Sequence, residues 1–129
     1  DRCNFGSEIG CVDYTIGLGT FDLRLKNSVG EAITIGDPDA RDDIVLTTES
    51  TTPYSCTFGT IDGGLGTTSY TWSAGDTIDI AWTGCNGADV GFVSGEKGKV
   101  GVTIVYHLAK SSATYSHEVA GEVFATVIE

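Results

Sequence analysis

Apolar and polar residues alternate along several short stretches of the chain, which is the pattern of β-strands with one buried face. In residues 20–27, TFDLRLKN, phenylalanine and leucine alternate with charged residues. Residues 76–85, DTIDIAWTGC, and residues 98–108, GKVGVTIVYHL, repeat this alternation. The sequence has no long 3.6-residue apolar period, which would indicate a helix. We therefore expect an all-β chain.

Segments rich in glycine, aspartate and threonine separate the predicted strands. Residues 36–43, GDPDARDD, and residues 60–69, TIDGGLGTTS, have the composition of loops. Seven to eight short strands joined by such turns predict an antiparallel β-sandwich, immunoglobulin-like in arrangement. Because the sequence shows neither a repeat nor a linker, we expect residues 1–129 to form a single domain. The centre of its core is expected from Ile80, Trp82, Val102, Ile104 and Tyr106.

The last predicted strand has apolar residues on both of its faces. Val119, Val123 and Val127 share one face, and Phe124 and Ile128 lie on the other. Apolar residues on both faces are typical of a strand that is covered on both sides. The end of this strand is therefore expected to be buried on both faces.

The charge of the chain excludes several classes of partner. Eighteen acidic and seven basic residues give a formal net charge of −11, which argues against nucleic acid and against anionic lipid surfaces. No apolar run reaches the roughly 18 residues of a membrane span, and no secretory signal peptide is evident. Because the sequence contains no methionine, we expect that the chain has been processed or trimmed and that an upstream segment is missing.

The four cysteines are more typical of disulfides than of a metal site. Cys3, Cys11, Cys56 and Cys85 form no CxxC pair and have no histidine at a zinc-ligand spacing. An even number in a small chain rich in glycine and threonine indicates an oxidising, extracellular compartment. Four cysteines allow three pairings, of which we favour Cys3–Cys11 and Cys56–Cys85 because neighbours in sequence close first. Loops of these lengths would stabilise the fold by about 2.5 and about 3.5 kcal/mol.

Two groups of residues have side chains that could bind a metal. If the last turn is centred near Ser112, His107 and His117 lie roughly opposite each other across a hairpin, although two ligands make a poor site. Four aspartates in one loop carry the oxygen ligands that calcium prefers, but this loop lacks the central glycine and closing glutamate of an EF-hand. These weak calcium candidates are Asp37, Asp39, Asp42 and Asp43.

The motifs of common enzymes are absent from the sequence. It has no GxSxG nucleophile elbow, and the glycine-rich stretch at 59–68 lacks the lysine and the helix of a phosphate-binding loop. Paired carboxylates of a glycoside hydrolase would be invisible in sequence alone. We therefore expect a protein that is not an enzyme and needs no cofactor, with a secreted hydrolase as a rival interpretation.

Several stretches of the chain resemble archaeal type IV pilin-like and archaellin-like proteins. Residues 95–129, GEKGKVGVTIVYHLAKSSATYSHEVAGEVFATVIE, look like the closing hairpin of such proteins. The stretches CNFGSEIGCVDYTI and FDLRLKNSVGEAITI resemble the segment after a pilin's N-terminal helix, and WSAGDTIDIAWTGC is similar to a further strand of the family. The resemblance spans most of the chain.

The resemblance implies a subunit of an extracellular filament with a role in adhesion at the cell surface. Pilin-like proteins of this kind carry a hydrophobic N-terminal helix that packs in the filament centre, while the β-domain faces outward. The chain departs from this pattern because the helix is not in the sequence. Either the helix has been removed, or subunits associate by donor-strand exchange, in which Phe124 and Ile128 of the last strand would mediate assembly.

A secreted binding module, specific for carbohydrate or dependent on calcium, is the alternative function. Sugars stack on aromatic faces, so this alternative expects Trp72 and Tyr70 to be exposed near the aspartate-rich loop.

Overall fold

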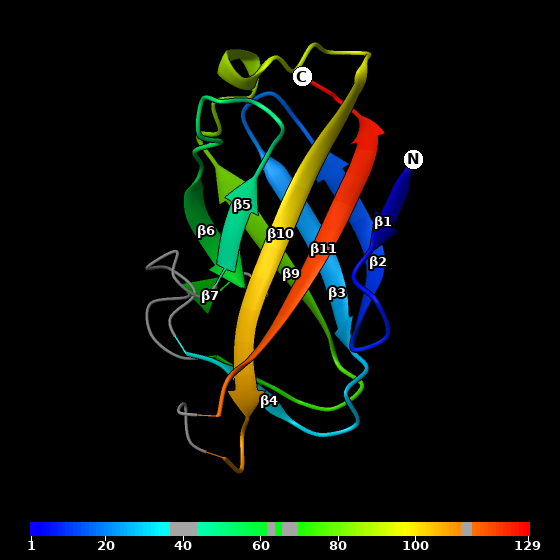
Figure 1. Ribbon diagram of the computed structural model, residues 1–129, viewed down its shortest axis with the longest axis vertical. Helices are drawn as coiled ribbons and strands as arrows, with labels where there is room; N and C mark the ends of the chain where they lie inside the picture. Colours follow the sequence, from blue (N-terminus) through cyan, green and yellow to red (C-terminus); the bar gives the residue numbers. More distant parts are fainter. Residues whose placement is uncertain (37–43, 62–63, 66–69, 112–114) are drawn as a thin grey trace.

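Two antiparallel β-sheets face each other and form the body of the molecule (Figure 1). The computed structural model describes residues 1–36, 44–61, 64–65, 70–111 and 115–129. The first sheet contains β1 (Arg2–Asn4), β4 (Ile33–Ile35), β5 (Ile44–Thr47), β8 (Tyr70–Trp72), β10 (Lys97–Leu108) and β11 (His117–Thr126). The second sheet contains β2 (Ile9–Ile16), β3 (Phe21–Asn27), β6 (Thr57–Ile61), β7 (Gly64–Leu65) and β9 (Thr77–Thr83). One short 3₁₀ helix, η1 (Gly87–Val90), precedes β10.

The predicted all-β sandwich is confirmed. The first sheet has the order β1-β11-β10-β4-β8 with β5 also paired to β10, and the second has the order β2-β3-β9-β6-β7. The described residues contain more strands than the seven to eight expected, because β1, β4, β7 and β8 are only two or three residues long. A strand this short has too few residues for alternation to be recognised.

The core lies between the sheets and comes from the strands that alternate most clearly. Leu23 of β3 is paired with Ile80 of β9, and Phe21 is paired with Trp82, whose ring lies 5.3 Å from that of Phe21. From the opposite sheet, β10 contributes buried residues at every second position from 98 to 106. The five residues expected at the centre of the core are all buried. Each fully buried large apolar side chain contributes about 1.5–3 kcal/mol relative to an exposed one.

The last strand packs tightly against the chain that leads from β1 to β2. Val119, Val123 and Val127 are buried on the inner face, as predicted. Gly121, between them, has no side chain, and the ring of Phe5 occupies the space that a Cβ atom there would need. Phe5 is only 2% exposed, so this aromatic ring takes the place of a side chain from β11.

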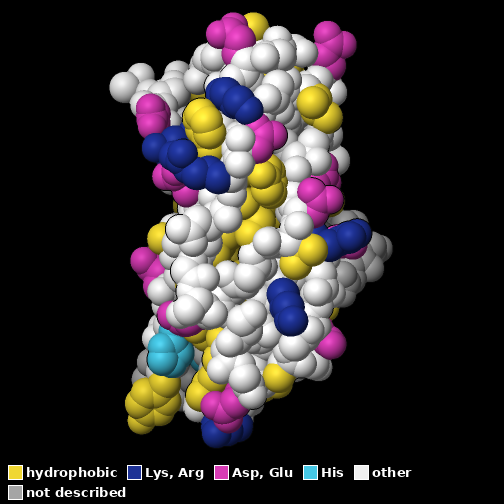
Figure 2. Space-filling model, turned by 90° about the vertical axis from the view of Figure 1, so that its right-hand side faces the viewer, with side chains coloured by type: hydrophobic (Ala, Val, Ile, Leu, Met, Phe, Trp, Pro, Cys, Tyr) yellow, Lys and Arg dark blue, Asp and Glu magenta, His cyan; other side chains and the backbone are white. Residues whose placement is uncertain are grey.

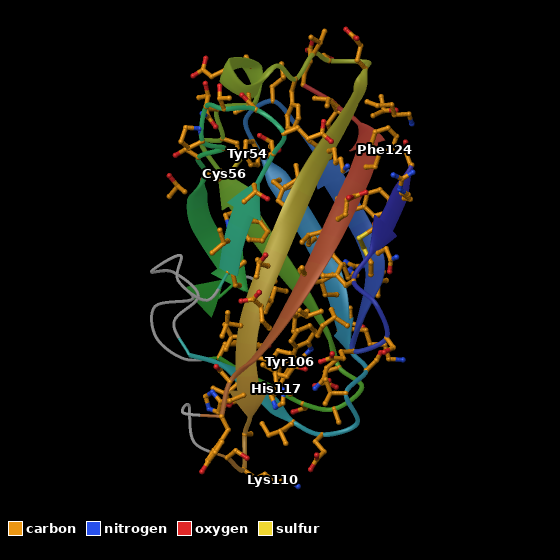
Figure 3. The ribbon with its side chains drawn as sticks, viewed as in Figure 1. Tyr54, Cys56, Tyr106, Lys110, His117 and Phe124 are labelled. Atoms are coloured by element: carbon orange, nitrogen blue, oxygen red, sulfur yellow. A yellow bond between two sulfur atoms is a disulfide. The ribbon has the colours of Figure 1, made fainter. Side chains whose placement is uncertain are left out.

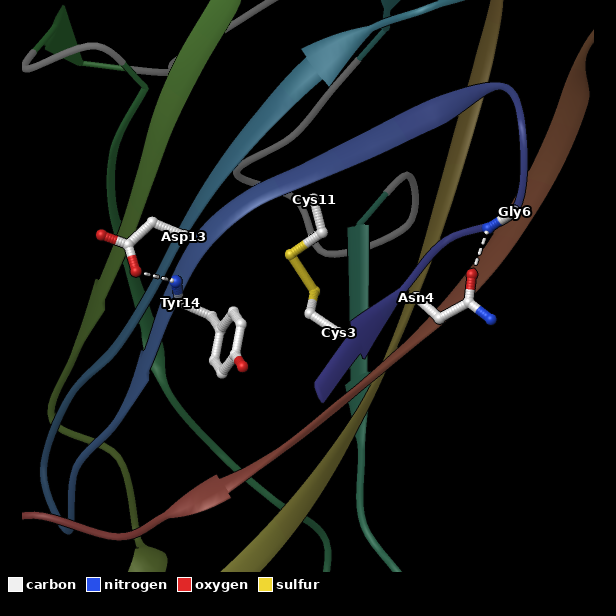
Figure 4. The surroundings of a disulfide bond; sticks show 6 residues. All are labelled: Cys3, Asn4, Gly6, Cys11, Asp13 and Tyr14. Carbon is white, nitrogen blue, oxygen red and sulfur yellow. Dashed lines mark hydrogen bonds between the residues drawn. A yellow bond between two sulfur atoms is a disulfide. The ribbon is translucent and has the colours of Figure 1, made fainter. Parts of the chain in front are cut away.

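The edge formed by β1 and β2 is closed by covalent and polar contacts (Figure 4). The Cys3–Cys11 disulfide joins β1 of the first sheet to β2 of the second, with its Cα atoms 6.0 Å apart. A β-bulge between Cys11 and Asp13 interrupts the pairing of β2, and the Asp13 carboxylate accepts a hydrogen bond from the Tyr14 amide at 2.8 Å. Bulges and charged side chains at an edge discourage the addition of a further strand.

We predict that Gly121→Ala lowers the free energy of unfolding by about 1–3 kcal/mol, the usual cost of an overpacked core. The new methyl group would overlap the Phe5 ring, which is enclosed and has no space into which to move. Chemical denaturation measures the change. The matched control is Gly19→Ala, because a Cβ atom at Gly19 meets no atom within 4 Å. Equal stability of the two variants would contradict the packing described here.

Candidate functional site

The cysteines form two disulfides, with the pairing favoured from the sequence. Cys3–Cys11 connects the two sheets at the β1–β2 edge. Cys56–Cys85 joins the residue before β6 to the second residue after β9, and Figure 3 shows Cys56 in the upper part of the molecule. The second bridge therefore fixes the ends of two neighbouring strands of the second sheet, and neither bridge leaves a free thiol.

The two histidines do not form a pair. In the register of β10 and β11, His117 is opposite Tyr106, and successive residues of a strand point to opposite faces. His107 therefore lies on the other face of the sheet from His117, and it is paired with Thr34 of β4. The hairpin register differs from the expected one by a single residue, which is enough to separate the two imidazoles.

Trp72 is not the exposed sugar-stacking residue that the binding-module interpretation expected. Its side chain is 0% exposed, and its indole N–H donates a hydrogen bond of 2.7 Å to the Asp76 carbonyl. Trp72 is therefore a core residue, because β8 is paired with β4 and turns this side chain inward. Tyr70 of the same strand is half-buried.

The remaining predicted site residues are the four aspartates of the calcium hypothesis and the two apolar residues of the assembly hypothesis. Asp37, Asp39, Asp42 and Asp43 lie outside the described residues. Within the described part of the chain, no group of three or more His, Cys, Asp or Glu side chains could hold a metal ion. Phe124 is half-buried beneath the Arg2 guanidinium, whose central carbon lies 5.0 Å from the ring centre, and Ile128 is 50% exposed.

The outer face of the second sheet carries a charged row that is already paired. The Arg24 guanidinium donates to both carboxylate oxygens of Asp79, at 2.6 and 3.3 Å. Partial burial, and then the nearby Asp79 charge, raise the pKa of Asp22 above its ordinary value. Arg24 and Asp79 therefore stabilise each other across β3 and β9, and we assign no ligand to these groups.

A hollow at the lower end of the molecule is the best candidate for a binding site. It has a volume of about 580 Å³. The sticks of Figure 3 show that Tyr106, His117 and Lys110 gather at this end, away from Tyr54 and Phe124. We call this cavity the hairpin-end hollow; its lining residues are Ser7, Glu8, Ser28, Val29, Glu31, Tyr106, Leu108 and His117.

Asn27 holds the turn that forms one wall of the hairpin-end hollow. This side chain is buried, and its amide donates to the carbonyls of Glu31 and Trp72 at 2.8 and 3.1 Å. Its carbonyl oxygen accepts a hydrogen bond from the Val29 amide at 2.9 Å. A buried polar group is stable when its hydrogen bonds are made, and here they fix the path of residues 28–31.

Backbone hydrogen bonds join this turn to the other two walls. The Ser28 amide donates to the Glu8 carbonyl at 3.0 Å, which ties the β3–β4 turn to the β1–β2 loop. The Ala109 amide donates to the Ala32 carbonyl at 2.9 Å, and Lys110 forms an ion pair of 2.5 Å with Glu31. Three segments that are far apart in sequence are thus fastened around one space.

The floor of the hollow combines an aromatic stack with a carboxylate. The Tyr106 hydroxyl donates a hydrogen bond to Glu8, and the His117 ring stacks on the Tyr106 ring with centroids 5.5 Å apart. Burial, followed by the hydrogen bond to Glu8, raises the pKa of Tyr106 to about 12. Tyr106 therefore remains a neutral donor at physiological pH, while Glu8 and His117 stay exposed at the surface.

A second hollow lies between the sheets near Tyr54, among Leu46, Pro53 and Trp82. Tyr54 is 7% exposed, and among the described residues its hydroxyl has no hydrogen-bond partner. Burial raises the pKa of Tyr54 to about 12. This space has a volume of about 230 Å³, below the 300–1,000 Å³ typical of small-molecule sites.

Comparisons of the chain with protein-family models, with curated proteins and with solved structures gave no match. In the described part of the chain, no helix is long and apolar enough to cross a membrane. Function therefore has to be argued from the fold and the hairpin-end hollow.

We predict opposite effects for two Tyr→Phe substitutions. Tyr54→Phe removes a buried hydroxyl without a protein partner, so stability stays equal or rises by up to about 1 kcal/mol. Tyr106→Phe removes the hydrogen bond to Glu8 and costs about 1–2 kcal/mol. Urea denaturation of both variants measures the difference. The assignment of partners is wrong if Tyr54→Phe is the more damaging change.

We also predict a loss of stability in alkaline solution between about pH 10 and about pH 12. Folding raises the pKa of both Tyr54 and Tyr106. As the pH rises, the unfolded chain therefore releases these two protons first, near the ordinary tyrosine pKa of about 10. The stabilisation from the two protonated hydroxyls is complete below about pH 10 and is lost as the pH rises through the folded-state pKa of about 12. Denaturation midpoints measured from pH 8 to pH 12 test this. In the double variant Tyr54→Phe/Tyr106→Phe the decline should be shallower than in the parent chain.

Proposed function

We propose that the chain is an extracellular structural subunit, the head domain of an archaeal type IV pilus-like or archaellum-like filament, with a role in adhesion. The observation that carries the proposal is the placement of the two disulfides. One ties the two sheets together at an edge, and the other fixes the ends of two neighbouring strands. Disulfides persist in oxidising compartments and resist unfolding, which suits a surface exposed outside a cell.

The positions of the chain ends support this role. In Figure 1 both termini lie in the upper part of the molecule, whereas the β10–β11 hairpin forms the lower end. A filament-forming segment joined to Asp1 would leave the hairpin end pointing away from the filament. β11 is paired with β10 along its whole length and with β1 at residues 122–124, which favours association through surfaces over donation of this strand.

A secreted binding module is the second candidate, because the hairpin-end hollow offers a ligand-sized space. Both candidates share an extracellular, disulfide-bonded sandwich. They differ in whether the chain assembles with copies of itself.

The coding sequence upstream of Asp1 tests the filament proposal. We expect a short basic leader followed by about 20–25 apolar residues, the length of a filament-core or membrane-spanning helix. A cleavable secretory signal peptide directly before Asp1 would contradict it. Immunogold labelling of filaments sheared from the native cells gives a second readout, in which an antibody against the chain should label the filaments along their length.

A further inference from the structure

The hairpin-end hollow is larger than four other hollows of the described surface. Its volume of about 580 Å³ lies within the 300–1,000 Å³ typical of small-molecule sites. The volumes of those four hollows are about 180–250 Å³. Its walls are also fixed in advance, by the Ser28–Glu8 and Ala109–Ala32 backbone hydrogen bonds and by the buried Asn27. A preformed site loses little conformational entropy on binding.

The lining residues offer hydrogen-bonding groups of both kinds next to apolar surface. Glu8 and Glu31 are acceptors, the hydroxyls of Ser7 and Ser28 donate and accept, and Val29 and Leu108 supply apolar contact. Neighbouring hydroxyl groups of a sugar ring need this mixture, because they donate and accept while the C–H face of the ring packs on apolar groups. The exposed His117 ring offers a face for such packing.

The charges of the hollow select among polar ligands. Two carboxylates in a chain of net charge −11 disfavour phosphates and acidic sugars. A basic peptide is also a poor fit, because Glu31 is already paired with Lys110 and Glu8 already accepts from Tyr106. The carboxylate oxygens that remain can accept hydrogen bonds from hydroxyl or amino groups. A neutral or amino sugar satisfies these conditions best.

The site lies where an adhesive contact would be made. Tyr115 is 71% exposed and lies two residues before His117 in the sequence, so this end of the molecule carries a second exposed aromatic side chain. Figure 2 shows a histidine and neighbouring hydrophobic side chains at the lower end of the face that carries β1 and β2. The chain termini lie toward the opposite end of the molecule.

We propose that the hairpin-end hollow binds a neutral or amino sugar of a glycan, with Glu8 as a hydrogen-bond acceptor and His117 as a packing surface. This names the ligand class of the adhesive role and so rests on the proposed function. The binding itself is testable on the isolated chain, whether or not the chain assembles.

The experiment is a printed array of neutral, amino and acidic oligosaccharides, followed by calorimetry with the strongest ligand. Neutral or amino oligosaccharides should bind, and acidic ones should not. Glu8→Gln should lower the affinity about tenfold, since hydrogen bonds to charged groups are worth about 1.5–3 kcal/mol. His117→Ala should also weaken binding. Glu96→Gln makes the same change of charge at an exposed position just before β10, at the opposite end of this strand from the hollow, and should leave the affinity unchanged.

Several results would overturn the proposal. They are the absence of any bound glycan, binding of acidic glycans alone, binding of a polylysine peptide without any glycan, and equal affinity of Glu8→Gln and the parent chain. Thermal unfolding of each variant shows whether a loss of affinity reflects a loss of fold. Failure of glycan binding would leave the upstream-sequence test of the filament proposal unaffected, so the two ideas can fail separately.

Discussion

Burial of one face of each long strand between the two sheets is the constraint on which the rest of the molecule depends. Leu23 and Ile80 meet in the second sheet, and Val102 and Ile104 face them from the first. A shift of one residue in the register would move every one of these side chains to solvent. The alternation therefore fixes the register of the paired strands and the face on which each side chain lies.

The short strand β1 is linked to the neighbouring edge strand β2, because three residues pair too weakly to hold β1 in place alone. β1 has three residues, paired only with residues 122–124 of β11. The Cys3–Cys11 bridge anchors it to β2, and Phe5 fills the space above Gly121 directly after it. Hydrophobic side chains show along the middle of this face, where the sheets meet (Figure 2). Packing, the disulfide and the bulge in β2 thus hold this edge together.

The sequence predicts the parts of the fold that repeat with period two, and it fails where contacts depend on the register of distant segments. Alternation identified β3, β9, β10 and the inner face of β11, and the nearest-neighbour cysteine pairing matches the structure. The binding-module alternative expected Trp72 at the surface, and the sequence could not test this, because a three-residue strand gives no signal of which way its side chains point. The hairpin-end hollow was not predicted as a site, although His117 in its lining had been considered for a metal pair with His107. Glu8 and Tyr106 are 98 positions apart, and only the folded sandwich brings them together. The Asn-Ser-Val-Gly turn at 27–30 was the one local signal available there.

Asn27 shows how the fold shapes the hairpin-end hollow, where we propose that a ligand binds. The buried amide forms hydrogen bonds with the backbone at Val29, Glu31 and Trp72. It therefore joins the end of β3 to β8 and shapes the turn that leads from β3 to β4. An apolar side chain at this position could fill the same space but could not direct the turn, because packing alone does not select one path for the backbone. The polar side chains of that turn are consequently held at the surface in a fixed arrangement. Loops positioned by a rigid scaffold in this way are where proteins place their recognition residues.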